Sequence, residues 1–148
     1  MEIQKILFPT DFSHTGDAAL SLAASLARER GATLLIVHVE EPPHAYGAGE
    51  MYYGIPEPAR EDLQQMLEKV EPSGAPLSIE RRLVTGDPAA TIARLAEEEH
   101  VDLIVMGTHG RTGLMRLLMG SVAEAVVRRA SCPVMTFKQA TRSTHPVG

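Results

Sequence analysis

The chain has 148 residues, of which 44% are hydrophobic and 22% charged, and its formal net charge is -5. This size suits one domain with a core of its own, and the composition excludes collagen, coiled coil or disorder as a description of the whole chain. The acidic balance argues against a general nucleic-acid binder. The single cysteine, Cys132, excludes a disulfide framework and a cysteine-based metal site. The first residues resemble neither a signal peptide nor a membrane span, so we expect a cytoplasmic protein.

Charge is distributed unevenly along the chain. Residues 103–148 contain six Lys or Arg and one acidic residue, Glu124, whereas the acidic excess lies in residues 1–102. This basic region coincides with a glycine-rich segment described below. It is either a solvated basic helix or a source of positive charge for a ligand.

Apolar runs of strand length alternate with helical patterns. The runs are rich in Ile, Leu and Val without interruption, which is typical of strands covered on both faces of a parallel sheet. We expect strands at residues 3–8, 33–39, 77–84, 101–106 and 133–137. We expect helices at residues 13–30, 57–71, from 88 onward and at 121–129. Asp87 and Pro88 suit the N-cap and first position of the third helix, and Gly31 suits the end of the first.

Apolar residues three and four positions apart indicate which helix faces point inward. The predicted inward residues are Leu22 and Leu26, then Leu63, Met66, Leu67 and Val70, then Ile92 and Leu95, and finally Val122, Ala125 and Val126. Strands and helices in strict alternation predict an α/β fold with a mostly parallel sheet and helices on both faces. Residues 1–138 form the expected domain, and residues 139–148 are a polar tail expected to fray.

One connection is too long for a simple turn between strand and helix. It runs from Glu40 to Pro58 and contains all three tyrosines of the chain. Long loops of this kind often cover a ligand. The alternative is that the tyrosines only attach the loop to its own domain.

Three glycines follow the fourth predicted strand at a distinctive spacing. Gly107 and Gly110 come first, and Gly120 follows immediately before Ser121, where a helix begins. Glycine permits positive φ and close approach of the backbone, so that N–H groups can converge on an anion. The helix N-terminus adds further N–H donors and a favourable dipole, while Arg111 and Arg116 add positive charge. The arrangement predicts a phosphate site; the alternative is that the glycines only serve tight turns.

The spacing Gly107-x2-Gly110-x9-Gly120-Ser121, preceded by VDLIVMG, resembles the nucleotide-binding motif of the universal stress protein family. The segments KILFPTDFS, LLIVHV, GDPAATIARLAEEEHVDLIVMG and SCPVMTF also match that family, so the resemblance covers roughly residues 2–138. It implies a three-layer, doubly wound, Rossmann-like fold with five parallel strands in the order 3-2-1-4-5. The first and fourth strands are then neighbours whose connections leave in opposite directions, and ligands bind at such a switch point.

The resemblance also implies roles for particular residues. Asp11 would accept hydrogen bonds from ribose hydroxyls, although it could equally cap a helix or close a local turn. Val39 would contact the adenine edge through its backbone. The remaining residues would line the base and sugar pocket (Pro9, Thr10, Met106) or hold the phosphates (Gly107, Gly110, Arg111, Gly120, Ser121, Val122). The implied ligand is ATP or another adenine nucleotide, with Mg²⁺ assumed only as its companion.

Other motifs are weaker. The residues from Ser13 to Ala18 faintly resemble a flavodoxin phosphate loop, but the last hydroxyl of that motif is missing and the chain has no Trp. A phosphorelay receiver would need an acidic pair where only Asp11 is present. The six histidines show no metal-binding spacing, so no metal site is expected. We interpret His38 as a packed histidine and Cys132 as a small buried hydrophobic residue.

The last strand lies at a sheet edge in the implied order, with Val134, Met135 and Phe137 available for pairing. The resemblance implies antiparallel pairing with a second copy, giving a twofold dimer; alternatively the C-terminal tail covers this edge. Three functional hypotheses remain. The chain is a nucleotide-binding stress-response sensor or regulator acting as a dimer, a slow ATPase or phosphotransferase using the same pocket, or a nucleotide-free interaction module. The motif contains no general base, which ranks the enzyme lower.

Overall fold

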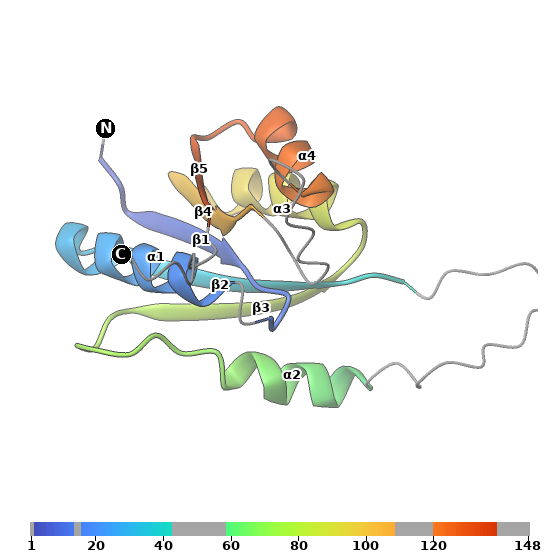
Figure 1. Cartoon of the computed structure of the whole chain (residues 1–148), viewed down its shortest axis with the longest axis horizontal. Helices are drawn as coiled ribbons and strands as arrows, with labels where there is room; N and C mark the ends of the chain where they lie inside the picture. The colour runs from blue at the N-terminus through green and yellow to red at the C-terminus, as the bar shows by residue number, and fades with distance from the viewer. Residues whose placement is uncertain (1, 14–15, 43–58, 109–119, 139–148) are drawn as a thin grey trace, which may run out of the picture.

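The computed structural model describes residues 2–13, 16–42, 59–108 and 120–138, and in this part of the chain one parallel sheet has the strand order β3-β2-β1-β4-β5 (Figure 1). The strands are β1 (Lys5–Pro9), β2 (Thr33–Glu40), β3 (Ile79–Thr85), β4 (Leu103–Gly107) and β5 (Val134–Phe137). The helices are α1 (Asp17–Arg30), α2 (Arg60–Glu68), α3 (Pro88–Glu98) and α4 (Ser121–Arg129). The predicted fold class and the implied strand order are confirmed.

Helices cover both faces of the sheet, so that successive strand residues enter different cores. Ile6 and Phe8 of β1 pack on the side of α1 and α2, whereas Leu7 packs on the side of α3 and α4. All three are buried. Figure 1 shows the same division into three layers. Because neither face of the central strands meets water, their sequences are apolar without alternation.

Strands β1, β3 and β4 begin two residues later than predicted, β5 begins one residue later, and β2 begins at Thr33 as predicted. Ile3, Leu77 and Val101 were expected to start strands, but each lies just before one and packs against a core. Apolar character therefore extends beyond the residues that pair.

Helix α1 also begins later than the predicted residue 13. The N–H of Gly16 donates to the Ser13 carbonyl at 3.3 Å, so the chain turns once before the helix starts at Asp17. Small side chains form most of the face that α1 buries, which lets the helix approach the sheet closely; Leu22 and Leu26 are only partly buried at its border. Gly31 ends the helix with φ 64°, as predicted.

The other helices confirm part of the predicted pattern. Asp87 caps α3, because its Oδ2 accepts from the N–H of Ala90 at 3.0 Å. In α4 the predicted inward residue Val122 is wrong: it is 38% exposed, whereas Ala123 and Val126 are buried. The α4 sequence SVAEAVVRR has apolar residues at most positions, so more than one face satisfies the helical period.

The neighbouring strands β1 and β4 define a switch point in the sheet. The helix that follows β1 packs on one face, and the helix that follows β4 packs on the other. At such a point the connections diverge and leave a crevice at the carboxyl ends of the strands. Within the described residues, no helix is both long and apolar enough to cross a membrane.

Candidate functional site

The exit from β1 is fixed by three hydrogen bonds to Thr10. Its N–H donates to the Val37 carbonyl at 2.7 Å, and its carbonyl accepts from Nδ1 of His38 at 2.8 Å. Its side-chain Oγ1 accepts from the N–H of Phe12 at 3.0 Å. Two of these bonds come from β2, so the loop after β1 is attached to the neighbouring strand.

Asp11 closes a local turn. Its Oδ1 accepts from the backbone N–H of Ser13 at 2.9 Å and from the Ser13 hydroxyl. The predicted local-turn role is therefore confirmed, although Asp11 is not the N-cap of α1, which is Gly16. The ribose role remains a prediction.

Phe12 adopts a left-handed backbone conformation with φ 66°. This region is unfavourable for an aromatic residue and is uncommon outside glycine, asparagine and aspartate. Its ring lies against the His38 ring, with centroids 4.3 Å apart and planes inclined by 38°. The packed-histidine interpretation of His38 is confirmed, with Thr10 and Phe12 among its partners.

Val39 presents its backbone toward the β1 side of β2. The Val37 carbonyl points to β1, as its bond to Thr10 shows, and residues two apart in a strand point the same way. Val39 lies beyond Pro9, the last β1 residue in the register with β2. Its N–H and C=O are thus directed to the side where the β1 chain has turned away. This orientation suits the predicted backbone contact with a base.

The exit from β4 is joined directly to the start of α4. The N–H of Gly120 donates to the carbonyl of Thr108 at 2.5 Å, and the N–H of Thr108 donates to the carbonyl of Phe137 at 3.1 Å. Sequence reasoning did not single out Thr108, whose side chain is buried. Its position directly after a buried strand and the first motif glycine was the available signal. Met106 is also buried and packs toward α3 and α4.

The two motif glycines in the described part of the chain do not have the expected left-handed conformation. Gly107 is the last residue of β4, in register with Phe137, and Gly120 has φ -69° and ψ 159°. The left-handed glycines among the described residues are Gly31, Gly74 and Gly86. Positive φ is therefore not the reason for glycine at 107 and 120, and close approach of the backbone to a ligand remains a prediction.

Gly120 is the N-cap of α4 and supplies no side-chain hydrogen bond to the first turn. The first N–H groups of a helix have no partner within the helix, so they suit an anion. Ser121 and Val122, both exposed, occupy this turn. The predicted residues Gly110 and Arg111 lie outside the described residues, as do Arg116, most of the connection from Glu40 to Pro58, and the tail after 138.

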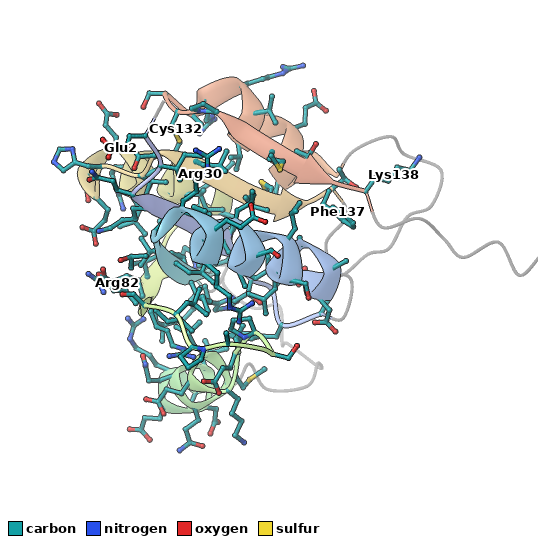
Figure 2. The ribbon with its side chains drawn as sticks, turned by 90° about the vertical axis from the view of Figure 1, so that its left-hand side faces the viewer. Glu2, Arg30, Arg82, Cys132, Phe137 and Lys138 are labelled. Atoms are coloured by element: carbon teal, nitrogen blue, oxygen red, sulfur yellow. The ribbon has the colours of Figure 1, made fainter. Side chains whose placement is uncertain are left out.

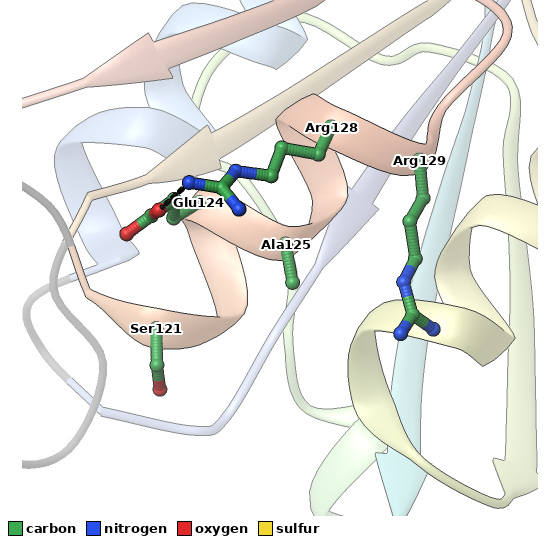
Figure 3. A pocket seen from close by; sticks show the side chains of 5 residues that line it. All are labelled: Ser121, Glu124, Ala125, Arg128 and Arg129. Atoms are coloured by element: carbon green, nitrogen blue, oxygen red, sulfur yellow. Dashed lines mark hydrogen bonds and ion pairs between the residues drawn. The ribbon is translucent and has the colours of Figure 1, made fainter.

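A depression of about 360 Å³ lies along α4, lined by Ser121, Glu124, Ala125, Arg128 and Arg129 (Figure 3). Arg128 pairs with Glu124 at 2.6 Å, and Arg129 approaches Asp87 at 4.0 Å. Both arginines therefore face an acidic partner. Among the residues that line the depression, Ser121 belongs to the predicted site.

Cys132 is partly buried, and burial raises the pKa of its thiol. A raised pKa lowers the thiolate fraction, which is the reactive form. Among the residues that the structure describes, no group of three or more His, Cys, Asp or Glu side chains could hold a metal ion.

Comparison with known proteins identifies the same family as the sequence motif. Residues 2–138 match the family described as "Universal stress protein family". Universal stress protein MJ0531 of Methanocaldococcus jannaschii is 37% identical over 140 residues, which cover 92% of this chain and 82% of that protein.

Solved structures share the fold. The structure of hypothetical protein MJ0577 has a TM-score of 0.70 at 26% identity, covering 94% of this chain and 98% of the other. A universal stress protein in complex with cAMP has a TM-score of 0.67 at 23% identity, covering 93% and 98%.

Proposed function

The chain belongs to the universal stress protein family, and from this premise we propose that it binds an adenine nucleotide, with ATP as its ligand, in the crevice above β1 and β4. Binding changes a surface that other proteins read, so the chain acts as a stress-response sensor or regulator. The observation that carries this proposal is the joining of Thr108 to Gly120 by a backbone hydrogen bond. That bond fixes the start of α4 at the exit of β4, beside the switch point.

The phosphates would occupy the start of α4. The N–H groups of its first turn receive no side-chain cap, and the helix dipole favours an anion at this end. Glycine at 107 and 120 allows phosphate oxygens to approach the backbone closely. In the proposed site the hydroxyl of Ser121 is a further donor.

The nucleoside would lie between the exits of β1 and β2. Asp11 lies directly after β1 and would accept from the ribose hydroxyls. The backbone groups of Val39 are directed toward the same side of β2 and would meet the base edge. The structural relative solved with cAMP has the same fold and also holds an adenine nucleotide.

Mg²⁺ would accompany ATP. This cation usually keeps several waters and is held by substrate phosphates with one or two carboxylates, so a dedicated protein cage is not required. Titrations with and without Mg²⁺ will show whether it contributes to affinity.

Calorimetric titration with ATP tests the proposal. Saturable binding is expected for the unmodified chain, with affinity reduced by about tenfold or more in Asp11→Ala, because a charge-assisted acceptor is lost. Gly120→Val is expected to weaken binding through its added side chain. Asp62→Ala, an exposed carboxylate in the first turn of α2, is the matched control and should bind normally. No binding at millimolar ATP would refute the proposal. Phosphate release that these pocket variants abolish would instead favour the ATPase.

We also propose that the chain forms a dimer through β5. This strand pairs with β4 on one side, and Met135 is 39% exposed, whereas Val134 and Phe137 are partly buried against the two cores. The carbonyls of Pro133 and Phe137 point to β4, so by strand alternation Val134 and Thr136 direct their backbone groups to the outer edge. Figure 2 shows Phe137 and Lys138 at one end of this strand and Cys132 at the other.

Native mass spectrometry of the purified protein tests the dimer and reports any nucleotide that remains bound. Thr136→Pro removes an outward N–H without removing an apolar side chain, and it is expected to yield monomers. Circular dichroism checks that this variant is folded. Arg128→Ala, on the exposed side of α4, should remain dimeric. A monomeric unmodified chain would contradict the proposal.

A further inference from the structure

We propose that His38 is a positioning residue for ribose recognition, because it holds both neighbours of Asp11 in place. Its Nδ1 bonds to the carbonyl of Thr10, and its ring packs on Phe12. The inference rests on the proposed function for its ligand. The contacts from which it is argued join β2 to the residues that follow β1 and are independent of any ligand.

The hydrogen bond to Thr10 requires a proton on Nδ1 of His38. A carbonyl oxygen only accepts, so Nδ1 must carry the proton and donate across 2.8 Å. The Thr10 N–H is bonded to the Val37 carbonyl at 2.7 Å. Both backbone polar groups of the residue before Asp11 are therefore fixed by β2, one by its backbone and one by its side chain.

The ring contact acts on the residue after Asp11. Phe12 has φ 66°, which an aromatic residue adopts only when its surroundings determine it. Contact with the His38 ring, together with the bond from the Phe12 N–H to Oγ1 of Thr10, keeps this conformation. The turn between Asp11 and Ser13 spans this residue, so the position of the carboxylate depends on it.

Packing alone does not require histidine at this position. His38 is partly buried at the end of β2, on the face that α1 covers, where an apolar residue could fill the space. The bond to Thr10 requires an N–H donor in addition to a flat ring. Two substitutions separate these requirements: His38→Phe keeps a ring without the donor, and His38→Asn keeps a donor near the position of Nδ1 without the ring.

Hydrogen exchange tests the structural half of the inference without any ligand. In His38→Phe, the N–H groups of Phe12 and Ser13, which donate to Thr10 and Asp11, should lose protection. The N–H of Leu34, near the start of β2 and bonded to the Ser78 carbonyl, should keep its protection. Unchanged exchange at Phe12 and Ser13 would overturn the claim that His38 holds the loop.

Binding of ATP and of 2′,3′-dideoxy-ATP tests the functional half. His38→Phe is expected to weaken ATP binding by about tenfold and to leave dideoxy-ATP unchanged, since only ATP offers ribose hydroxyls to Asp11. His38→Asn should recover most of the ATP affinity. His100→Ala is the matched control, because His100 is exposed, lies between α3 and β4, and has no proposed contact with the ligand.

Each outcome bears on one of the two proposals. Equal loss of both nucleotides in His38→Phe would show a general packing role and overturn the inference. Equal binding of both by the unmodified chain would refute ribose recognition while leaving nucleotide binding intact. Failure of the unmodified chain to bind either nucleotide would refute the proposed function. Hydrogen exchange would still decide whether His38 holds the loop.

Discussion

The amino ends and the carboxyl ends of the strands, here called the amino edge and the carboxyl edge, are held together in different ways. At the amino edge, where strands begin, Asp102 accepts from the N–H groups of Gln4 and Lys5 at 2.8 and 3.1 Å. The N–H of Asp102 donates in turn to the Lys5 carbonyl. One carboxylate and four backbone groups thus join the start of β4 to the start of β1.

At the carboxyl edge near β1, the hydrogen bonds hold a loop in an unfavourable conformation. Thr10, Asp11 and His38 together keep Phe12 left-handed. Such strain is usually retained where geometry serves a ligand. Contacts at the amino edge therefore contribute to stability, whereas contacts at this part of the carboxyl edge mainly determine shape. Substitutions at the two edges should separate these effects.

The largest expected effect on stability is at Gly86. It tests whether the difference between the two edges, described above for β1, also holds at the carboxyl end of β3. Gly86, after β3, has φ 154°, and a Cβ there would collide with Oγ1 of the buried Thr91. Gly86→Ala should lower the free energy of unfolding by about 3 kcal/mol in urea titrations. Gly31 has φ 64°, but a Cβ there would meet open space. Gly31→Ala should therefore lower the free energy of unfolding by only about 1 kcal/mol. Equal losses of stability in the two variants would show that Thr91 moves away from the added Cβ. The positive φ alone would then determine the loss.

The second prediction concerns the amino edge directly. Asp102→Ala leaves the N–H groups of Gln4 and Lys5 without their carboxylate, and should lower the free energy of unfolding by about 2 kcal/mol. Its ATP affinity should stay within about twofold, because the substitution lies at the opposite edge from the proposed site. Urea unfolding and calorimetric titration measure the two quantities. A tenfold loss of affinity would contradict the separation of the edges.

A smaller effect is expected at Arg60, which joins α2 to the carboxyl ends of two strands. Its guanidinium donates to Glu40 at 2.9 Å, to the Thr85 hydroxyl at 3.1 Å and to the Leu83 carbonyl at 2.9 Å. The side chain is more than half exposed, so Arg60→Ala should cost only about 1 kcal/mol of stability. Arg60→Lys should retain part of this, since lysine keeps the charge without the planar fork. Thermal unfolding at two salt concentrations separates the contribution of the ion pair with Glu40 from that of the other two hydrogen bonds.

The smallest expected effect concerns the reactivity of the Cys132 thiol, which lies just before β5. Burial raises the pKa of this thiol, so at any given pH less thiolate is present than in a free cysteine. Alkylation by iodoacetamide should be slow near neutral pH and should accelerate only above the ordinary thiol pKa of about 8.5. The protein unfolded in urea serves as the reference. A rate that levels off below that pH would contradict the prediction.

Periodicity predicted the sheet and its helices because both faces of β1, β2 and β4 are buried. It did not predict the inward face of α4, where Val122, Ala123, Ala125, Val126 and Val127 offer several equivalent stripes. It placed the start of α1 at Ser13, because the turn formed by Asp11 and Ser13 leaves no mark in hydrophobic spacing.

The glycines located the candidate site, but one of the two reasons given for them, positive φ, is wrong at both described positions. Their spacing located the exit of β4 and the start of α4, yet neither Gly107 nor Gly120 is left-handed. The residue that is left-handed, Phe12, could not have been predicted from its type. Its conformation depends on His38, a residue distant in sequence that only the sheet brings near. Contacts of this kind follow from topology, and local pattern does not contain them.

The bond between Thr108 and Gly120 has a consequence for protein engineering. Because it links the residue after β4 to the N-cap of α4, it holds the two ends of the intervening segment close together. A segment anchored in this way can be exchanged for another of different length at little entropic cost. The sheet and α4 would then form a fixed framework that accepts inserted segments of different sequence.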